Sequence, residues 1–215
     1  MDEFVPKLGP FIVHSLERDS LAKSGATLIS DFCTMVESQK IVDGFNDYTP
    51  MLFQMLNKDT VEREGKLAAI IAIADTITMT KEKFGTFYPR TFELFFQAAL
   101  HSVSDIDQQD REYVEYMISL QNALIEAFTS IAQELSSLDD TSKQAFAQQG
   151  ETLMTFLVKS SGPKYNPTED KIREIVGLFG DLASSLPSLK NILQHKLVGD
   201  ILNTAKTMTG NPETL

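Results

Sequence analysis

The residues best suited to chemistry lie in an acidic segment near the middle of the chain. Residues 105–115 carry five carboxylates and one basic side chain, Arg111, and a further acid, Glu126, follows about three helical turns later. The five acids are Asp105, Asp107, Asp110, Glu112 and Glu115. Carboxylates in such excess suit ion pairs with the lysine and arginine side chains of a partner. A face that meets only water would give the same pattern, so both interpretations stay open.

The sequence offers no comparable set of residues for catalysis, metal binding or phosphate binding. His14, His101 and His195 are far apart, and none has a second His or Cys at metal-ligand spacing. Cys33 lies in an apolar run, which predicts a buried and unreactive thiol. Residues 177–180 include two glycines but lack the spacing of a phosphate-binding loop. We therefore expect no enzymatic activity, no cofactor and no metal site.

The whole chain of 215 residues carries a formal net charge of -11, and most of the acidic excess lies in its first two thirds. Residues 1–138 carry 21 acids against 11 Lys and Arg, whereas residues 139–215 carry 9 against 8. Such a field repels nucleic acid and anionic membranes and favours basic proteins, although solubility alone explains it equally well. The single cysteine, the acidic N-terminus and the lack of a long apolar run lead us to expect an intracellular protein without a membrane span.

One long helix is predicted to position the central acids. Apolar residues recur in steps of three and four at Tyr113, Met117, Leu120, Leu124, Ala127, Ile131 and Leu135. A second apolar line runs beside the first, so we expect neighbouring helices to cover this helix on two sides. The polar line that remains, which we call the acidic stripe, consists of Glu112, Glu115, Ser119, Asn122, Glu126, Thr129 and Gln133.

A repeated pattern predicts the architecture around this helix. Asp31, Asp75 and Asp181 each follow a small residue inside an apolar run, and Glu126 holds the equivalent place in the central helix. These four acids are 44, 51 and 55 residues apart, which is the range of the two-helix HEAT and armadillo repeats. A short acid at a fixed place in each repeat can bond an adjacent backbone group or basic side chain, although a role in ligand binding is the alternative.

Three prolines are expected to mark the beginnings of helices. Pro6, Pro50 and Pro89 each follow an aromatic residue closely and precede an apolar run. Because proline lacks the N–H group that has no partner at a helix start, each is predicted in the first turn of a helix.

We predict an all-α fold, an α-solenoid in which antiparallel helix pairs form a right-handed superhelix of HEAT repeats. The predicted pairs are 3–17 with 19–38, 44–57 with 60–79, 85–103 with 110–135, and 141–160 with 167–185. Residues 188–208 predict a weaker capping pair. Residues 1–215 are thus expected to form a single array of about four repeats. Because the first helix is apolar on most sides, we expect a fragment of a longer solenoid.

The central helix also resembles that of a known family. Residues 107–131 resemble the long helix near the C-terminus of importin-β, or karyopherin-β, with its acid-rich start and its Leu-Glu-Ala-Tyr-Thr pattern. Residues 28–33, 73–77 and 177–182 are similar to that family's Gly-Asp segments. The resemblance covers roughly residues 4–186 and implies the C-terminal HEAT-repeat region of a nuclear transport receptor. This chain has no Trp, whereas the family's inner face uses tryptophans.

The resemblance implies partners and candidate site residues. The family's acidic surface binds the basic importin-β-binding helix of importin-α or other basic cargo, for which the matching residues are Asp107, Asp110, Glu112, Glu115 and Glu126. Phenylalanine-glycine nucleoporins bind grooves between outer helices, and this role is assigned to Phe92, Phe95 and Phe96, which are otherwise expected in the core. Ran-GTP is expected mainly on repeats outside this segment.

The expected location is the cytoplasm, the nucleus and the nuclear pore. The alternative function is that of a HEAT-repeat scaffold subunit in a larger complex, which would bind through apolar surfaces that are insensitive to salt.

Overall fold

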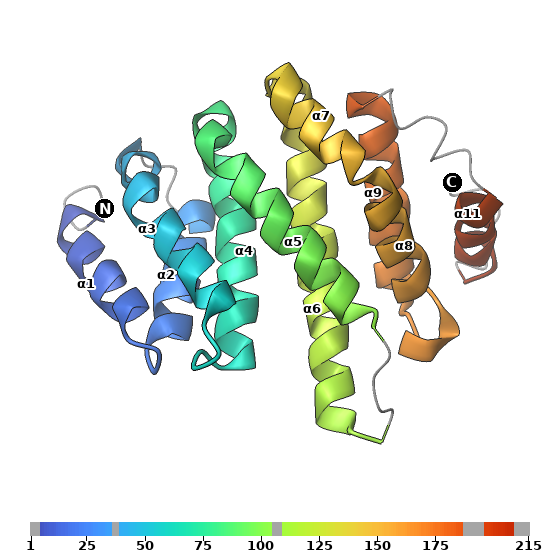
Figure 1. Cartoon of the computed structure of the whole chain (residues 1–215), viewed down its shortest axis with the longest axis horizontal. Helices are drawn as coiled ribbons and strands as arrows, with labels where there is room; N and C mark the ends of the chain where they lie inside the picture. The colour runs from blue at the N-terminus through green and yellow to red at the C-terminus, as the bar shows by residue number, and fades with distance from the viewer. Residues whose placement is uncertain (1–4, 36–38, 105–108, 187–195, 209–215) are drawn as a thin grey trace. The chain divides into compact units, whose positions relative to one another are not determined.

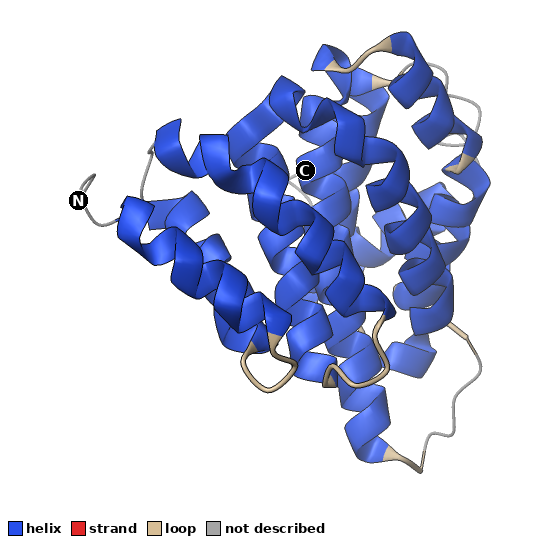
Figure 2. Cartoon of the chain, turned by 60° about the vertical axis from the view of Figure 1, so that its left-hand side comes forward, coloured by secondary structure: helices blue, strands red, loops and turns tan. Residues whose placement is uncertain are grey.

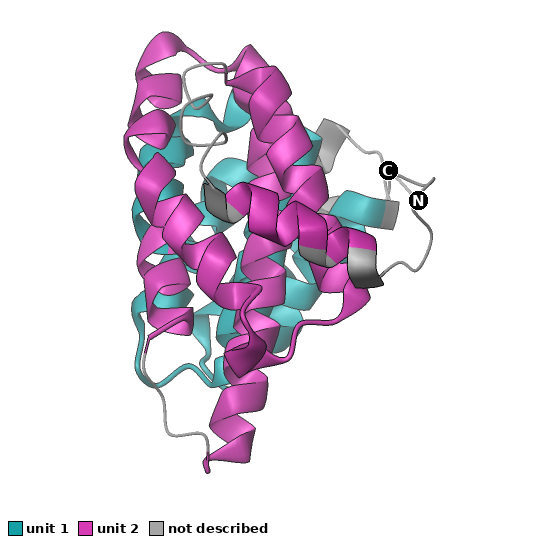
Figure 3. Ribbon diagram, turned by 90° about the vertical axis from the view of Figure 1, so that its right-hand side faces the viewer, with its two compact units in different colours: residues 1–94 teal, residues 95–215 magenta. Residues whose placement is uncertain are grey.

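The computed structural model describes residues 5–35, 39–104, 109–186 and 196–208. All regular elements within these residues are helices, and no strand occurs among them (Figure 2). This confirms the predicted all-α solenoid class. The contacts divide the chain into two compact units, residues 1–94 and 95–215, which Figure 3 distinguishes by colour. The division falls within helix α5 (Tyr88–Ser102), and each unit is described by itself below.

The first unit contains two helix pairs, as predicted (Figure 1). Its helices are α1 (Val5–Glu17), α2 (Ala22–Met35), α3 (Gln39–Asn57) and α4 (Arg63–Thr80). Helix α1 packs on α2 and α3, and α4 packs on α2 and α3. The turns that end the pairs are joined, because Asp19 accepts hydrogen bonds from Lys58 Nζ at 3.2 Å and from Thr60 Oγ1 at 2.5 Å. These two bonds hold the pairs in register at one end.

Pro50 is not in the first turn of its helix, in contrast to the prediction. Helix α3 begins at Gln39, about three turns earlier, so Pro50 lies inside it. The ring removes the hydrogen bond that an N–H at this position would donate one turn back. Burial of Phe45 and Tyr48 before the proline and of Leu52 after it continues one apolar face, which offsets that loss. Pro6 and Pro89 do lie in the first turns of α1 and α5.

A seven-residue 3-10 helix, η1 (Lys81–Phe87), follows α4 directly and was absent from the prediction. Lys81 ends α4 with a positive φ of 51° and donates its N–H to the carbonyl of Ile77. The rings of Phe84 and Phe87 in η1 pack on Phe45 of α3, with ring centroids 6.4 and 5.8 Å away. An aromatic cluster therefore fixes η1 against the first unit.

The second unit is built around α6 (Arg111–Glu134), the predicted central helix. After η2 (Leu135–Ser137) come α7 (Asp140–Gln148), α8 (Gly150–Ser160), η3 (Pro163–Tyr165), α9 (Glu169–Ser185) and α11 (Lys196–Met208). Helix α6 packs mainly on α9, and α11 packs on α9 and α8. The first part of the predicted capping pair, residues 188–195, lies outside the described residues.

The single helix predicted over residues 141–160 is two helices. The chain turns at Gln149, whose N–H donates to the carbonyl of Phe146 at 3.0 Å, and α8 begins at the buried Gly150. Phe146 in α7 and Phe156 in α8 both reach Phe128 of α6, with ring centroids 6.5 and 5.9 Å away. The change of direction at Gln149 lets both short helices bury an aromatic ring against α6.

Candidate protein-binding face on α6

Helix α6 separates a buried face from an exposed polar face, as its pattern predicts. The side chains of Met117, Leu124 and Phe128 are buried completely. Along the acidic stripe every residue is exposed except Thr129, which is half-buried. The helix thus places carboxylates and short polar groups along one solvent-facing line.

The predicted acids occupy different positions along this helix. Glu112, Glu115 and Glu126 are exposed members of the acidic stripe. Asp110 caps the helix, because its Oδ1 accepts the N–H of Tyr113 at 3.0 Å. Asp107 lies outside the described residues. The structure therefore places three of the five candidate acids on one line and gives a fourth a structural bond at the start of α6.

The carboxylates are the groups of the acidic stripe best able to bind a partner. The hydroxyls of Ser119 and Thr129 donate to carbonyls of their own helix, at 3.0 Å to Glu115 and 2.9 Å to Ile125. No ion pair to the Glu115 carboxylate is found among the described residues. A cationic side chain that approaches Glu115 would therefore not have to displace a cation from within this part of the protein.

Two tyrosines directly follow two of the glutamates in the sequence, and their rings lie near each other on α6. Their pattern alone did not suggest a binding role. Tyr113 follows Glu112 and Tyr116 follows Glu115; both are half-buried, with ring centroids 6.2 Å apart. The Tyr113 hydroxyl lies 3.2 Å from His101 Nε2, which fixes the ring against the end of α5. Aromatic faces attract cations, so each ring can supplement the neighbouring carboxylate in binding lysine or arginine. Their i, i+3 spacing next to the two glutamates was the signal in the sequence.

The polar face continues from α6 onto α9. Gln133, the last residue of the acidic stripe, donates from Nε2 to Asp181 Oδ2 at 3.3 Å. Next to Asp181 along α9, Gly177 and Gly180 are exposed, and a Cβ atom added at either would meet nothing within 4 Å. At these two positions next to Asp181, α9 therefore presents bare backbone to the solvent.

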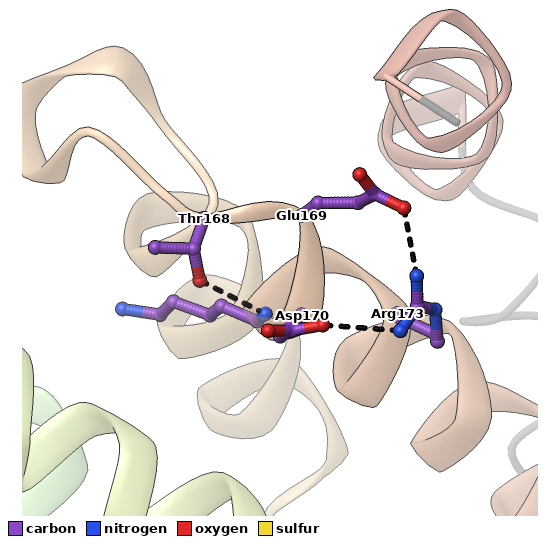
Figure 4. Close-up of polar contacts among 5 residues, drawn as sticks. Thr168, Glu169, Asp170 and Arg173 are labelled. Carbon is purple, nitrogen blue, oxygen red and sulfur yellow. Dashed lines mark hydrogen bonds and ion pairs between the residues drawn. The ribbon is translucent and has the colours of Figure 1, made fainter. Parts of the chain in front are cut away.

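The first turn of α9 differs, because one basic side chain of the same helix pairs with both of its acids (Figure 4). Arg173 reaches back to both, with Nη2 2.7 Å from Glu169 Oε1 and Nη1 3.0 Å from Asp170 Oδ1. The hydroxyl of Thr168 accepts the N–H of Lys171 at 3.2 Å and caps the helix. This end of α9 therefore adds less free negative charge than its sequence suggests.

The recurring aspartates act partly as predicted, since two of them join neighbouring helices. Asp75 on α4 accepts a hydrogen bond from the hydroxyl of Ser30 on α2, and Asp181 accepts from Gln133. The donors are neutral side chains rather than the backbone or basic groups that we expected. Burial raises the pKa of Asp75; the Ser30 bond opposes the rise and the nearby charge of Asp31 adds to it. Asp31 itself is exposed.

The three phenylalanines assigned to a nucleoporin groove are buried. Phe92 packs on Tyr88, with ring centroids 5.6 Å apart, in the first unit. Phe95 and Phe96 pack on Phe128 in the second unit, at 6.4 and 4.9 Å. The structure thus gives each of them a core contact. The exposed large apolar side chain of α5 is Leu100, at 47%.

Among the described residues, no three or more His, Cys, Asp and Glu side chains are grouped so that they could hold a metal ion. Cys33 is buried beside Thr76, and burial raises the pKa of its thiol to about 11, which favours the unreactive form. Within the same residues, no helix has both the length and the apolar character needed to cross a membrane.

Comparison with known proteins indicates the family to which the chain is related. Residues 1–206 match a family model described as importin subunit beta-1-like, TPR repeats. The chain is also similar to importin subunit beta-1 of Schizosaccharomyces pombe (strain 972 / ATCC 24843), with 24% identity over 217 residues that cover 98% of this chain. It spans only 24% of that relative's length. TPR and HEAT repeats are both antiparallel helix pairs, which is the arrangement found in each unit.

Proposed function

Because this chain belongs to the importin subunit beta-1-like family, we propose that it binds a basic helix in nuclear protein import. The helix would be the importin-β-binding segment of importin-α or a similar segment of other basic cargo. The protein would then work in the cytoplasm, in the nucleus and at the nuclear pore, and would have no catalytic role. Family membership supports the general role of a nuclear transport receptor, and the acidic stripe supports the choice of ligand.

The observation that carries this proposal is the exposed line of Glu112, Glu115 and Glu126 on α6. Each ion pair at such an exposed site contributes roughly 0.2–1 kcal/mol, so no single glutamate would dominate. Tyr113 and Tyr116 would add cation–π contacts beside the first two glutamates. These rings would take the place of the tryptophans that this chain lacks.

The surface of α9 supports a ligand that is itself a helix. A helix that lies across the acidic stripe near Gln133 would next meet Asp181, and the bare backbone at Gly177 and Gly180 would let it come close. Asp181 would offer a further carboxylate, because Gln133 donates to only one of its two oxygens.

The test is a binding measurement with the importin-β-binding peptide at increasing salt. Raising the salt from about 0.1 M to about 1 M shortens the Debye length from about 10 Å to about 3 Å, so affinity should fall steeply. Tight binding of a different partner that salt leaves unchanged, together with no binding of the basic peptide, would favour a scaffold function instead.

We further propose that α5 contributes to nucleoporin binding. Since Phe95 and Phe96 are buried in the second unit, they would form the floor of the site, and a nucleoporin phenylalanine would pack on Leu100, one turn after Phe96. A buried phenylalanine contributes roughly 1.5–3 kcal/mol before the costs of association, so each site should be weak. An NMR titration with a phenylalanine-glycine peptide should shift the signals of α5. Ran-GTP would bind mainly to repeats outside this segment.

A further inference from the structure

A lysine is buried in the second unit where the helical pattern calls for an apolar residue. Lys171 is only 3% exposed, and it begins a line that continues through the buried Ile175, Leu178 and Leu182 of α9. Lysine is seldom fully buried unless it is paired, because removing an ammonium group from water is costly. Its position therefore calls for an explanation beyond packing.

The Lys171 side chain begins a chain of hydrogen bonds that joins three helices. Its Nζ donates to Gln121 Oε1 on α6 at 2.6 Å, and Gln121 Nε2 donates to the carbonyl of Ser102 at the end of α5 at 2.8 Å. Gln121 and Ser102 are both completely buried. A carbonyl at the C-terminal end of a helix carries a partial negative charge from the helix dipole. The hydrogen bonds therefore lead from the ammonium group to a partial negative charge.

No carboxylate neutralises the Lys171 ammonium group directly in the described residues. The helix α6 faces it with the neutral amide of Gln121, and no charged side chain of α5 or α11 is found in contact with it there. Glu174, exposed one turn along α9, favours the charged form from a distance. Burial outweighs that effect and lowers the pKa of Lys171 to about 8.

A second set of hydrogen bonds lies just before α9 and joins η3 to the segment that follows α5. The carbonyl of Ser104, just after α5, accepts from Tyr165 Oη at 3.3 Å and from Lys164 Nζ at 3.4 Å, both in η3. The hydroxyl of Thr168 then caps α9. The start of α9 is thus held by polar bonds, in contrast to the buried apolar residues Ile175, Leu178 and Leu182 further along the helix.

We propose that the hydrogen bonds Lys171–Gln121–Ser102 form a latch, a contact that holds the start of α9 on α6. The strength of this latch depends on the protonation of Lys171. When Lys171 is charged, opening the first turns of α9 returns the ammonium group to water, and this hydration lowers the free-energy cost of opening. When Lys171 is neutral, this gain disappears while the amine can still donate to Gln121. The latch is therefore weaker near neutral pH and closes as the pH rises.

The direction of this pH dependence follows from proton linkage. The closed state has the lower pKa, so the open state binds more protons between about pH 8 and the ordinary lysine value of 10.5. Stability of the closed state therefore rises with pH across this window. Between about pH 7 and about pH 9.5, the opening constant should fall on the order of tenfold or more.

Hydrogen exchange of the full chain, corrected for intrinsic rates, tests the latch. Protection of the first turns of α9 should rise on the order of tenfold between the two pH values in the native sequence. Lys171→Met should be well protected at both, while Lys159→Met, which removes an exposed lysine of α8, should behave like the native chain. Gln121→Glu provides a buried carboxylate and should move the rise to higher pH. Protection that does not change with pH in the native chain, or a Lys171→Met variant that keeps the native pH dependence, would overturn the proposal.

Discussion

Gln133 at the end of α6 donates a hydrogen bond from its side-chain amide to Asp181 on α9, over 3.3 Å. This bond joins the last residue of the acidic stripe to one of the recurring aspartates. Residues that the sequence analysis assigned to two separate roles, ligand binding and repeat stacking, thus belong to one polar face. A change at Asp181 should therefore affect both the packing of α9 and the charge offered to a ligand.

Charge reversal on the acidic stripe should strongly weaken binding of the basic peptide. Glu112→Lys with Glu115→Lys replaces two exposed carboxylates with cations that repel lysine and arginine, and affinity should fall by more than about tenfold, with each lost pair and each new repulsion contributing. The measurement is calorimetry or fluorescence anisotropy at low salt, after circular dichroism has shown that the variant folds.

The matched control is Glu17→Lys with Asp59→Lys. Both residues are exposed, both lie next to turns of the first unit, and the change in net charge is the same. This variant should bind with nearly native affinity. Equal weakening by both double variants would mean that the peptide responds to the overall field and not to the acidic stripe.

Replacing the two exposed glycines of α9 with alanine should raise stability and weaken ligand binding. Glycine inside a helix costs about 1 kcal/mol relative to alanine, and an added Cβ at Gly177 or Gly180 meets nothing within 4 Å. Gly177→Ala with Gly180→Ala should therefore raise the free energy of unfolding by about 1–2 kcal/mol, measured by urea denaturation. If a basic helix lies on this surface, the added methyl groups should also weaken its binding. A variant that is more stable and binds normally would place the ligand away from α9.

Ionisation of the Asp75 carboxylate should lower the stability of the folded protein, and the pH dependence of stability should show it. A raised pKa means that the folded state holds the proton more tightly, so the contribution of Asp75 becomes less favourable as the pH rises through that pKa. Asp75→Asn removes the charge and keeps an oxygen that can accept from Ser30. Its melting temperature should exceed the native value at pH 7, and the difference should vanish as the pH falls toward 3.8, the ordinary value for aspartate. The exposed Asp47→Asn is the control and should show a much smaller difference.

The cap of α9 should contribute measurably to the stability of the second unit. Thr168→Ala leaves the N–H of Lys171 without the oxygen that it donates to and should lower the free energy of unfolding by about 1 kcal/mol. Thr168→Ser keeps that oxygen and should stay close to native in a urea titration. An equal loss in the two variants would show that the threonine methyl group, not the cap, is responsible.

The features that the sequence predicted well are those that one helix determines by itself. The steps of three and four along α6 correctly separated its buried residues from the acidic stripe. Pro50, Gln149 and Lys171 were misjudged or missed because tertiary contacts decide them. Burial on both sides of Pro50 continues α3, aromatic packing on Phe128 divides the helix at Gln149, and Gln121 stabilises a lysine in an apolar position. The position of Lys171 on an apolar line was visible in the sequence, but its partner was not.

The short helix η1 also restricts how this protein can vary in length. A 3-10 helix has three residues per turn, so Phe84 and Phe87 lie on the same side of η1, and both rings reach Phe45. One residue inserted before Phe84 would rotate both rings by about a third of a turn and move them away from Phe45 together. Insertions that most surface connections tolerate should therefore be rare between α4 and α5 in related proteins, and alignments of the family should show a fixed length there.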